Sequence, residues 1–297
     1  MTILVNDMCG ERRIAFMSED CVKKIVIWRN LTLNFGDVVD ARITAFQPVL
    51  KGYFAKTDKG SVFIPTVQPF TEGQTVRIQI TKEARLGKDA TAHLVSEDIS
   101  KPEIKPDKEI SASLMDGIIE EALAATVSFG KGAFLRIERT QVAWTIDVDS
   151  GQSTEPLSVV NQLAVSEIVR QIALKNMGGL ILVDFAGSKR GKIGKTLEAK
   201  LQQALKADEL VNACNRTPAG LFEVERRRER ADLWALCASD NPIAVYYRVR
   251  RAIEACRSGN PTIRVAPSVL ALLRQTGVRG RLEPLFDRPI AEFEIRE

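Results

Sequence analysis

The chain has few of the side chains on which most hydrolase sites depend. A single histidine, His93, stands among 297 residues. This excludes a histidine-rich metal cage and disfavours Ser-His-Asp and Cys-His catalysis, because both need a positioned imidazole. Any hydrolytic chemistry must therefore use carboxylates. Their oxygens favour hard cations such as Mg²⁺ or Mn²⁺.

Cysteines and long apolar runs are also scarce. The five cysteines form no Cys-x-x-Cys pair, and their scatter is typical of intracellular thiols rather than of a disulfide framework. No apolar run approaches the ~20 residues that a membrane helix needs. The stretch at residues 1–7 is too short for a signal peptide. We therefore expect a cytoplasmic protein with no membrane partner.

The charge balance is mild, but the basic residues are clustered. The net charge is only +4 and the pI is about 8.8. Local clusters attract phosphates whatever the total charge, so they say more about partners than the sum does. With 45% hydrophobic residues, the chain can build two or three packed units.

The first hundred residues read as strands. Residues 1–36 alternate apolar and polar side chains, which predicts two or three strands that pack on the rest of the protein. Residues 37–100 hold five more short strands separated by turn residues, which predicts a Greek-key barrel of the oligonucleotide-binding type. Its strands are expected at Val38–Phe46, Tyr53–Ala55, Val62–Pro65, Val76–Ile80 and Ala90–Val95. A polar, proline-bearing linker follows at 101–109.

From residue 110 helices and strands alternate, which predicts a βαβ unit with parallel strands over residues 110–236. The first helix, Ile110–Ala125, has an apolar face with Leu114, Ile118, Ile119, Ala122 and Leu123. The apolar run Leu180–Phe185 predicts a strand buried on both faces. The other elements are strands at Ala133–Ile137 and Val142–Val148, a helix at Leu157–Lys175 stopped by Gly178-Gly179, and a helix at Ile193–Ala207.

Residues 237–297 predict a small C-terminal α/β lobe. A helix is expected at Ala244–Cys256, a strand at Thr262–Val265 and a second helix at Pro267–Gln275. The fold class is thus α+β and multidomain, with a barrel, an α/β unit and a small lobe.

Three aspartates end the two strands of the βαβ unit. The period of two puts Asp147 and Asp149 on one face of their strand, and Asp184 ends the next strand. Ligands of open α/β sheets lie at the carboxyl ends of strands, and converging acids repel unless a cation neutralises them. A metal site is therefore one interpretation. The other is that each aspartate caps a turn or helix.

A basic loop follows Asp184. Residues 187–196 read Gly-Ser-Lys-Arg-Gly-Lys-Ile-Gly-Lys-Thr, and a phosphate-binding P-loop would need glycine where Lys189 stands. A loop that grips an RNA backbone through Lys189 and Arg190 fits better. A merely solvated loop stays open.

The longest ordered pattern resembles a known family. Residues 145–151 read Thr-Ile-Asp-Val-Asp-Ser-Gly, and residues 170–185 read Arg-Gln-Ile-Ala-Leu-Lys-Asn-Met-Gly-Gly-Leu-Ile-Leu-Val-Asp-Phe. Both are similar to the catalytic core of the ribonuclease E/G family. The resemblance implies a deoxyribonuclease-I-like subdomain and a ribonuclease-H-like remnant at 1–36, whose strands pack on the catalytic core. It also implies that Asp147 and Asp184 bind Mg²⁺, with Mn²⁺ as an alternative.

The barrel is similar to that family's RNA-binding barrel. The segments at 51–54 and 62–65 carry the likeness. It implies that Phe54, Phe63 and Lys88 contact single-stranded RNA, because rings stack on unpaired bases and an ammonium meets phosphate. The alternation alone favours the core for both rings, and only the resemblance favours contact with RNA.

The chain departs from the family pattern at three places. The family has asparagine where Asp149 stands. Its sensor for the RNA 5′ phosphate is absent between barrel and helix, which predicts cleavage that ignores the 5′ phosphate. Its Cys-Pro-x-Cys zinc link is reduced to Cys237, so we expect no structural zinc. The C-terminal lobe is similar to the family's dimerisation domain, which leaves a homodimer open.

An arginine cluster at 226–230 completes the candidates. Arg226 and Arg228 follow a segment similar to one near the family's active site, and they either contact RNA phosphates or form a solvated helix face. The sequence therefore predicts an endoribonuclease in which Asp147, Asp149 and Asp184 are catalytic. A non-catalytic RNA-binding or regulatory protein is the alternative.

Overall fold

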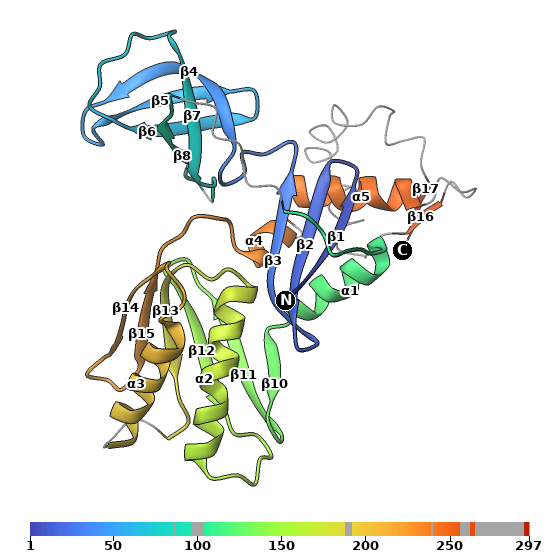
Figure 1. Ribbon diagram of the computed structural model, residues 1–297, viewed down its shortest axis with the longest axis vertical. Helices are drawn as coiled ribbons and strands as arrows, with labels where there is room; N and C mark the ends of the chain where they lie inside the picture. The colour runs from blue at the N-terminus through green and yellow to red at the C-terminus, as the bar shows by residue number, and fades with distance from the viewer. Residues whose placement is uncertain are drawn as a thin grey trace.

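The computed structural model describes residues 1–85, 87–96, 104–187, 192–238, 240–255, 262–264 and 294–296. Figure 1 shows a barrel, a small N-terminal sheet and a larger sheet covered by helices. Among the described helices, none has the length and hydropathy that crossing a membrane would require.

The N-terminal unit is a four-stranded sheet with one helix on it. Strands β1 (Thr2–Met8), β2 (Glu11–Ser18) and β3 (Cys21–Arg29) are antiparallel, and β9 (Lys108–Glu109) pairs parallel with β1. Helix α1 (Ala112–Leu123) packs on this sheet. The predicted strands are thus confirmed. Residues 108–123 belong with them rather than with a linker and the α/β unit.

Helix α1 begins later than predicted, and one residue of its predicted apolar face is exposed. The Ser111 hydroxyl accepts a hydrogen bond from the backbone N–H of Leu114, which fixes the start of the helix. The buried stripe is Met115, Ile119 and Ala122. Leu114 is 54% exposed, so placing it on the apolar face was wrong.

Residues 38–94 form the expected closed barrel of five strands, in the order β4-β5-β6-β8-β7. Strands β6 and β8 run parallel, and the other neighbours are antiparallel. The bounds are β4 Val38–Gln47, β5 Gly52–Thr57, β6 Gly60–Pro65, β7 Thr75–Lys82 and β8 Ala90–Leu94.

Glu83 joins the barrel to the segment that follows the large sheet. Its backbone N–H donates to the carbonyl of Glu229 (2.8 Å), and its carboxylate accepts from the backbone N–H groups of Phe35 (2.9 Å) and Ala231 (2.8 Å). The guanidinium of Arg230 lies 4.8 Å from the ring centre of Phe35. These contacts fix the base of the barrel.

The large sheet has six strands in the order β10-β11-β12-β13-β15-β14. Only β12 and β13 pair parallel, joined by helix α2 (Leu157–Leu174), which confirms the predicted βαβ unit. The strands are β10 Thr126–Phe129, β11 Ala133–Arg139, β12 Ala143–Asp149, β13 Gly179–Asp184, β14 Val211–Arg216 and β15 Phe222–Arg226. Strands β14 and β15 were not predicted.

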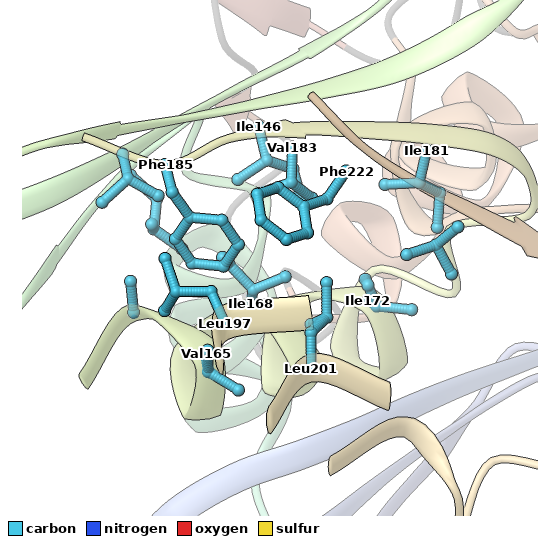
Figure 2. Close-up of a cluster of buried hydrophobic side chains, with 14 of the residues drawn as sticks. Ile146, Val165, Ile168, Ile172, Ile181, Val183, Phe185, Leu197, Leu201 and Phe222 are labelled. Carbon is cyan, nitrogen blue, oxygen red and sulfur yellow. The ribbon is translucent and has the colours of Figure 1, made fainter. Parts of the chain in front are cut away.

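Helices α2 and α3 (Lys192–Leu205) cover one face of this sheet (Figure 1). Figure 2 shows side chains from both helices packed against the sheet, with the ring of Phe185 edge-on to that of Phe222. On β13, Ile181 and Val183 are fully buried, whereas Leu180 and Leu182 are half-buried. Burial of β13 on both faces was therefore wrong, because the described helices lie on one side only.

Helix α2 ends at Leu174, and Asn176 rather than the glycine pair reverses the chain after it. Asn176 has a φ of +49°, and the backbone N–H groups of Asn176 and Met177 donate to the carbonyls of Ala173 and Ile172. This is a Schellman C-cap, in which a left-handed residue returns the chain to the last turn of the helix. Gly178 and Gly179 lie beyond this cap.

Helix α5 (Pro242–Ala255) packs against the N-terminal strands. The Tyr247 hydroxyl accepts from the backbone N–H of Leu31 (3.2 Å), and Arg251 donates to the side chain of Asn6 (2.7 Å). The predicted boundary at residue 237 therefore does not set α5 apart from these strands. Beyond it, β16 (Thr262–Arg264) pairs with β17 (Glu294–Arg296). The helix predicted at 267–275 lies outside the described residues.

Candidate active site

Asp147 and Asp184 are direct neighbours across two parallel strands. The register of β12 on β13 pairs Asp147 with Asp184, one step after Ile146 pairs with Val183. Ile146 and Val183 are buried beneath the helices, so both aspartates lie on the opposite, open face. Neighbouring strands are ~4.8 Å apart, which brings the two carboxylates within reach of one cation.

Phe185 fixes the end of β13. Its side chain is 1% exposed and its ring centre lies 4.9 Å from that of Phe222 in the core. Because successive side chains alternate across the sheet, a buried Phe185 holds Asp184 on the open face. The Asp-Phe pair thus combines a buried anchor with a carboxylate on the open face.

Asp149 is engaged differently from the other two aspartates. Its Oδ1 accepts a hydrogen bond from the backbone N–H of Gly151 (2.8 Å), and its Oδ2 lies 3.3 Å from a guanidinium nitrogen of Arg136. It therefore closes a turn and forms an ion pair. The turn-capping interpretation holds for this aspartate.

The donor set suits a cation that keeps much of its water. The described part of the chain contains no group of three or more His, Cys, Asp or Glu side chains arranged to hold a metal. Mg²⁺ does not need such a cage, because it is commonly bound by one or two carboxylates together with waters. Asp147 and Asp184 fit that requirement, and Mn²⁺ accepts the same hard oxygens.

Arg136 joins this acidic edge, and the sequence pattern did not single it out. In the register of β11 on β12, Arg136 pairs with Asp147 and Phe134 pairs with Asp149. A row of Arg136, Asp147 and Asp184 therefore crosses three strands on the open face. Alternation along β11 shows that Arg136 faces away from the core, but its partner depends on a register that the sequence alone does not give.

Two of the three arginines predicted to contact RNA, Arg226 and Arg228, lie inside or against the fold. Arg226 is 7% exposed, and its guanidinium donates to Asp208 (2.7 Å), to the side chain of Asn176 and to the carbonyl of Met177. Its donors are thus used within the protein, and we assign it a structural role. It is a strand residue rather than part of a solvated helix face.

The position of Arg228 explains why residues 178 and 179 are both glycine. Its Nε donates to the carbonyl of Gly178 (2.7 Å), and a Cβ on Gly179 would lie 1.9 Å from its guanidinium. Gly179 also has a φ of +90°, which favours glycine. Burial, and then the nearby Arg85 and Arg139, lower the pKa of Arg228. Lys189 and Arg190, two further predicted contacts, lie outside the described residues.

Phe54 and Phe63 pair on the outside of the barrel. They are register partners on β5 and β6, and their ring centres are 5.4 Å apart. The neighbouring positions Tyr53, Ala55 and Val62 point into the barrel core, so the core interpretation of the two phenylalanines was wrong. Lys88 is exposed in the connection between β7 and β8.

The barrel and the acidic edge lie at opposite ends of the large sheet. Gly179, at the start of β13, pairs with Arg226, and the residues just after Arg226 contact the barrel through Glu83. Asp184 ends β13 at the other edge. Figure 1 shows the barrel beyond the far end of this sheet. Six residues at ~3.3 Å each give β13 a length of about 20 Å.

Cys237 is the thiol nearest the family's zinc link. It ends helix α4 (Leu233–Cys237), and burial raises its pKa. Whether the protein carries structural zinc stays a prediction for metal analysis.

Part of the chain is similar in sequence to known ribonucleases. Ribonuclease G of Salmonella typhimurium (strain SL1344) is 28% identical over 189 residues, which are 59% of this chain and 38% of that protein. Ribonuclease E of Synechocystis sp. is 31% identical over 135 residues, or 43% of this chain and 20% of that protein. The aligned regions thus span about two fifths of this ribonuclease G and one fifth of this ribonuclease E.

A family model gives the broader assignment. The model of the ribonuclease E/G family matches residues 66–229, which is more than half of the chain and includes Asp147, Asp149 and Asp184. The matched region also contains the parallel strand pair and the helix between them. The chain therefore belongs to the ribonuclease E/G family.

Proposed function

We propose that the protein is an endoribonuclease that hydrolyses single-stranded RNA with a Mg²⁺ ion held by Asp147 and Asp184. The observation that carries the proposal is their register pairing on the open face of two parallel strands. Family membership supports it, because relatives that align with part of this chain bear the names ribonuclease G and ribonuclease E.

The roles of the residues follow from their charges and positions. Two neighbouring carboxylates repel each other and the phosphates of RNA, and a divalent cation between them offsets both repulsions. When bound, the ion supplies a hydroxide nucleophile and stabilises charge on the scissile phosphate. Asp147 and Asp184 orient that ion, and the buried Phe185 holds Asp184 in place. As in the family, products would carry a 5′ phosphate and a 3′ hydroxyl.

The barrel would bind the RNA that the acidic edge cuts. The half-exposed rings of Phe54 and Phe63 offer a stacking platform for unpaired bases, and the exposed Lys88 offers charge to phosphates. The chain passes from the barrel to β9 without a sensor module. We therefore propose that the 5′ phosphorylation state does not affect cleavage. A homodimer and a cytoplasmic location complete the proposal.

The decisive experiment replaces single carboxylates. Asp184→Asn should lower cleavage of an unstructured RNA by at least about a hundredfold, because the metal contributes several kcal/mol to the transition state. Glu138→Gln is the matched control, since Glu138 is exposed on the same face two residues from Arg136. Chelation of divalent ions should abolish cleavage by wild type. Equal cleavage by wild type and Asp184→Asn would end the proposal.

Asp149 keeps a second function open. Where the family has asparagine, this chain has an acid, and that departure favours a non-catalytic RNA-binding or regulatory protein. The same assay decides between the two. If wild type binds the RNA tightly but leaves it intact with either Mg²⁺ or Mn²⁺, the regulatory function holds.

A further inference from the structure

Arg136 stands beside the two aspartates with most of its donors facing solvent. Its side chain is 58% exposed, and one guanidinium nitrogen lies 3.3 Å from Oδ2 of Asp149. The guanidinium carbon lies 5.1 Å from the ring centre of Phe134. A guanidinium carries five N–H donors in a planar fork, so one ion pair leaves several donors for another acceptor.

We propose that Arg136 binds an RNA phosphate next to the Asp147–Asp184 pair, and that Asp149 positions Arg136 instead of binding metal. This inference rests on the proposed function, because it names a further contact of the same site. The ligand class is the phosphodiester backbone of single-stranded RNA, whose paired oxygens match the fork of a guanidinium.

The engagement of Asp149 supports its positioning role. One oxygen is held by the backbone N–H of Gly151 and the other faces Arg136, so both already have partners in the fold. Asp149 also lies two residues beyond Asp147, past the register pair that joins Asp147 to Asp184. Its carboxylate is thus committed to the turn and to the arginine.

The turn that holds this pair is tightly built. Gly151 has a φ of +51°, and a Cβ there would lie 2.3 Å from the carbonyl oxygen of Gly132 and 2.9 Å from the ring of Phe134. The chain therefore packs closely on Phe134, and Phe134 packs under the guanidinium of Arg136. The turn, the ring and Asp149 together limit where the guanidinium can point.

Electrostatics explains what the arginine adds. Three aspartates at one edge repel the RNA backbone even when a divalent ion offsets two of their charges. Arg136 offsets the charge of Asp149 and presents positive potential on the side where the strand must approach. An arginine in this place makes Asp149 compatible with an anionic substrate.

The test measures RNA binding in the absence of divalent ions, so that no cleavage occurs. A short unstructured RNA is titrated at several salt concentrations against wild type, Arg136→Ala, Arg136→Lys and Asp149→Asn. Losing one phosphate contact should lower the slope of log affinity against log salt by about 0.7. We expect this for Arg136→Ala. Arg136→Lys should retain the slope but bind less tightly, because lysine lacks the fork.

The role of Asp149 is tested separately by measuring Mn²⁺ binding with calorimetry in the absence of RNA. Asp149→Asn should retain the Mn²⁺ binding that Asp147→Asn removes, and its effect on RNA affinity should not add to that of Arg136→Ala. An unchanged salt slope in Arg136→Ala, or loss of Mn²⁺ binding in Asp149→Asn, would overturn the inference. Failure of the proposed function would appear instead as wild type that does not cleave with Mg²⁺, which leaves both binding assays readable.

Discussion

At the scale of single residues, the most unusual side chain is a buried lysine. Lys175 is 0% exposed, and its ammonium donates to the carbonyl of Ala122 (2.6 Å) in the last turn of α1. Its own carbonyl accepts from the backbone N–H of Leu233 (3.0 Å). Lys175 therefore ties α2 to α1 and α4. Burial, and then the nearby Arg170, lower its pKa to about 8.

This lysine should make stability depend on pH in the alkaline range. The pKa is about 8 in the folded protein and 10.5 in the unfolded chain, so between these values the unfolded chain binds more protons. Stability attributable to Lys175 therefore rises from pH 8 to 10.5, by up to about 3 kcal/mol. Urea unfolding of wild type and Lys175→Met at pH 7.5 and 10.5 measures it.

Comparing wild type with Lys175→Met removes the contribution of other titrating groups. Cysteine and tyrosine ionisation alters both proteins alike, so only the difference between wild type and Lys175→Met is compared. That difference should move in favour of wild type at the higher pH. A difference that does not change with pH would contradict the lowered pKa.

Within the secondary structure elements, replacing two different glycines with alanine should have opposite effects on stability. Gly117 lies exposed inside α1, where a Cβ would meet no atom within 4 Å. Gly179 opens β13 with a φ of +90°, and Arg228 occupies the space of its missing Cβ. Glycine weakens the first element and is required by the second.

Gly117→Ala should stabilise the protein by about 0.5–1 kcal/mol, because alanine reduces the entropy lost when the helix forms. Gly179→Ala should destabilise it by at least ~1–2 kcal/mol, because an L-residue is strained at that φ and displaces Arg228. Chemical denaturation measures both changes. If both alanines had the same sign of effect, the assignment of Gly179 to a required backbone conformation would be wrong.

At the scale of the whole molecule, the barrel and the acidic edge lie at opposite ends of a six-stranded sheet. An RNA that used both would have to extend along β13, over about 20 Å. The two surfaces would then act as linked binding sites on one strand. Such linkage strengthens binding only when the ligand is long enough to reach both.

Replacement of the aromatic pair should therefore affect long and short substrates differently. Phe54→Ala with Phe63→Ala should raise KM for a long RNA about tenfold or more, because each stacked base contributes ~1–3 kcal/mol. An oligonucleotide too short to span the sheet should be cut by this variant and by wild type at similar rates.

Phe46→Ala is the matched control for this prediction. Its ring is 52% exposed on the same barrel, but it packs on the inward-facing Tyr53 rather than on the Phe54–Phe63 pair. It should change neither KM by more than a fewfold. An equal rise in KM for long and short RNA in the Phe54/Phe63 variant would contradict the prediction that one long RNA binds both the barrel and the cleavage site.

The sequence predicted local structure well wherever a single periodicity dominated. Alternation located the barrel strands and put Asp147 and Asp149 on one face, and the crossover helix implied that β12 and β13 are parallel. The prediction failed where the hydrophobicity of a segment did not match its burial. The run at β13 reads as buried on both faces, yet only the side that carries Ile181 and Val183 is covered.

Most of the elements and the faces of their side chains could be inferred from the amino-acid sequence, because these follow from short-range alternation and helical spacing. The pairing and register of the strands, in contrast, are known only from the folded molecule. That arrangement set Asp147 beside Asp184, placed Arg136 against Asp149, buried Arg226 and moved α1 and α5 to the N-terminal sheet. Such contacts join residues distant in the chain, so no local pattern carries them.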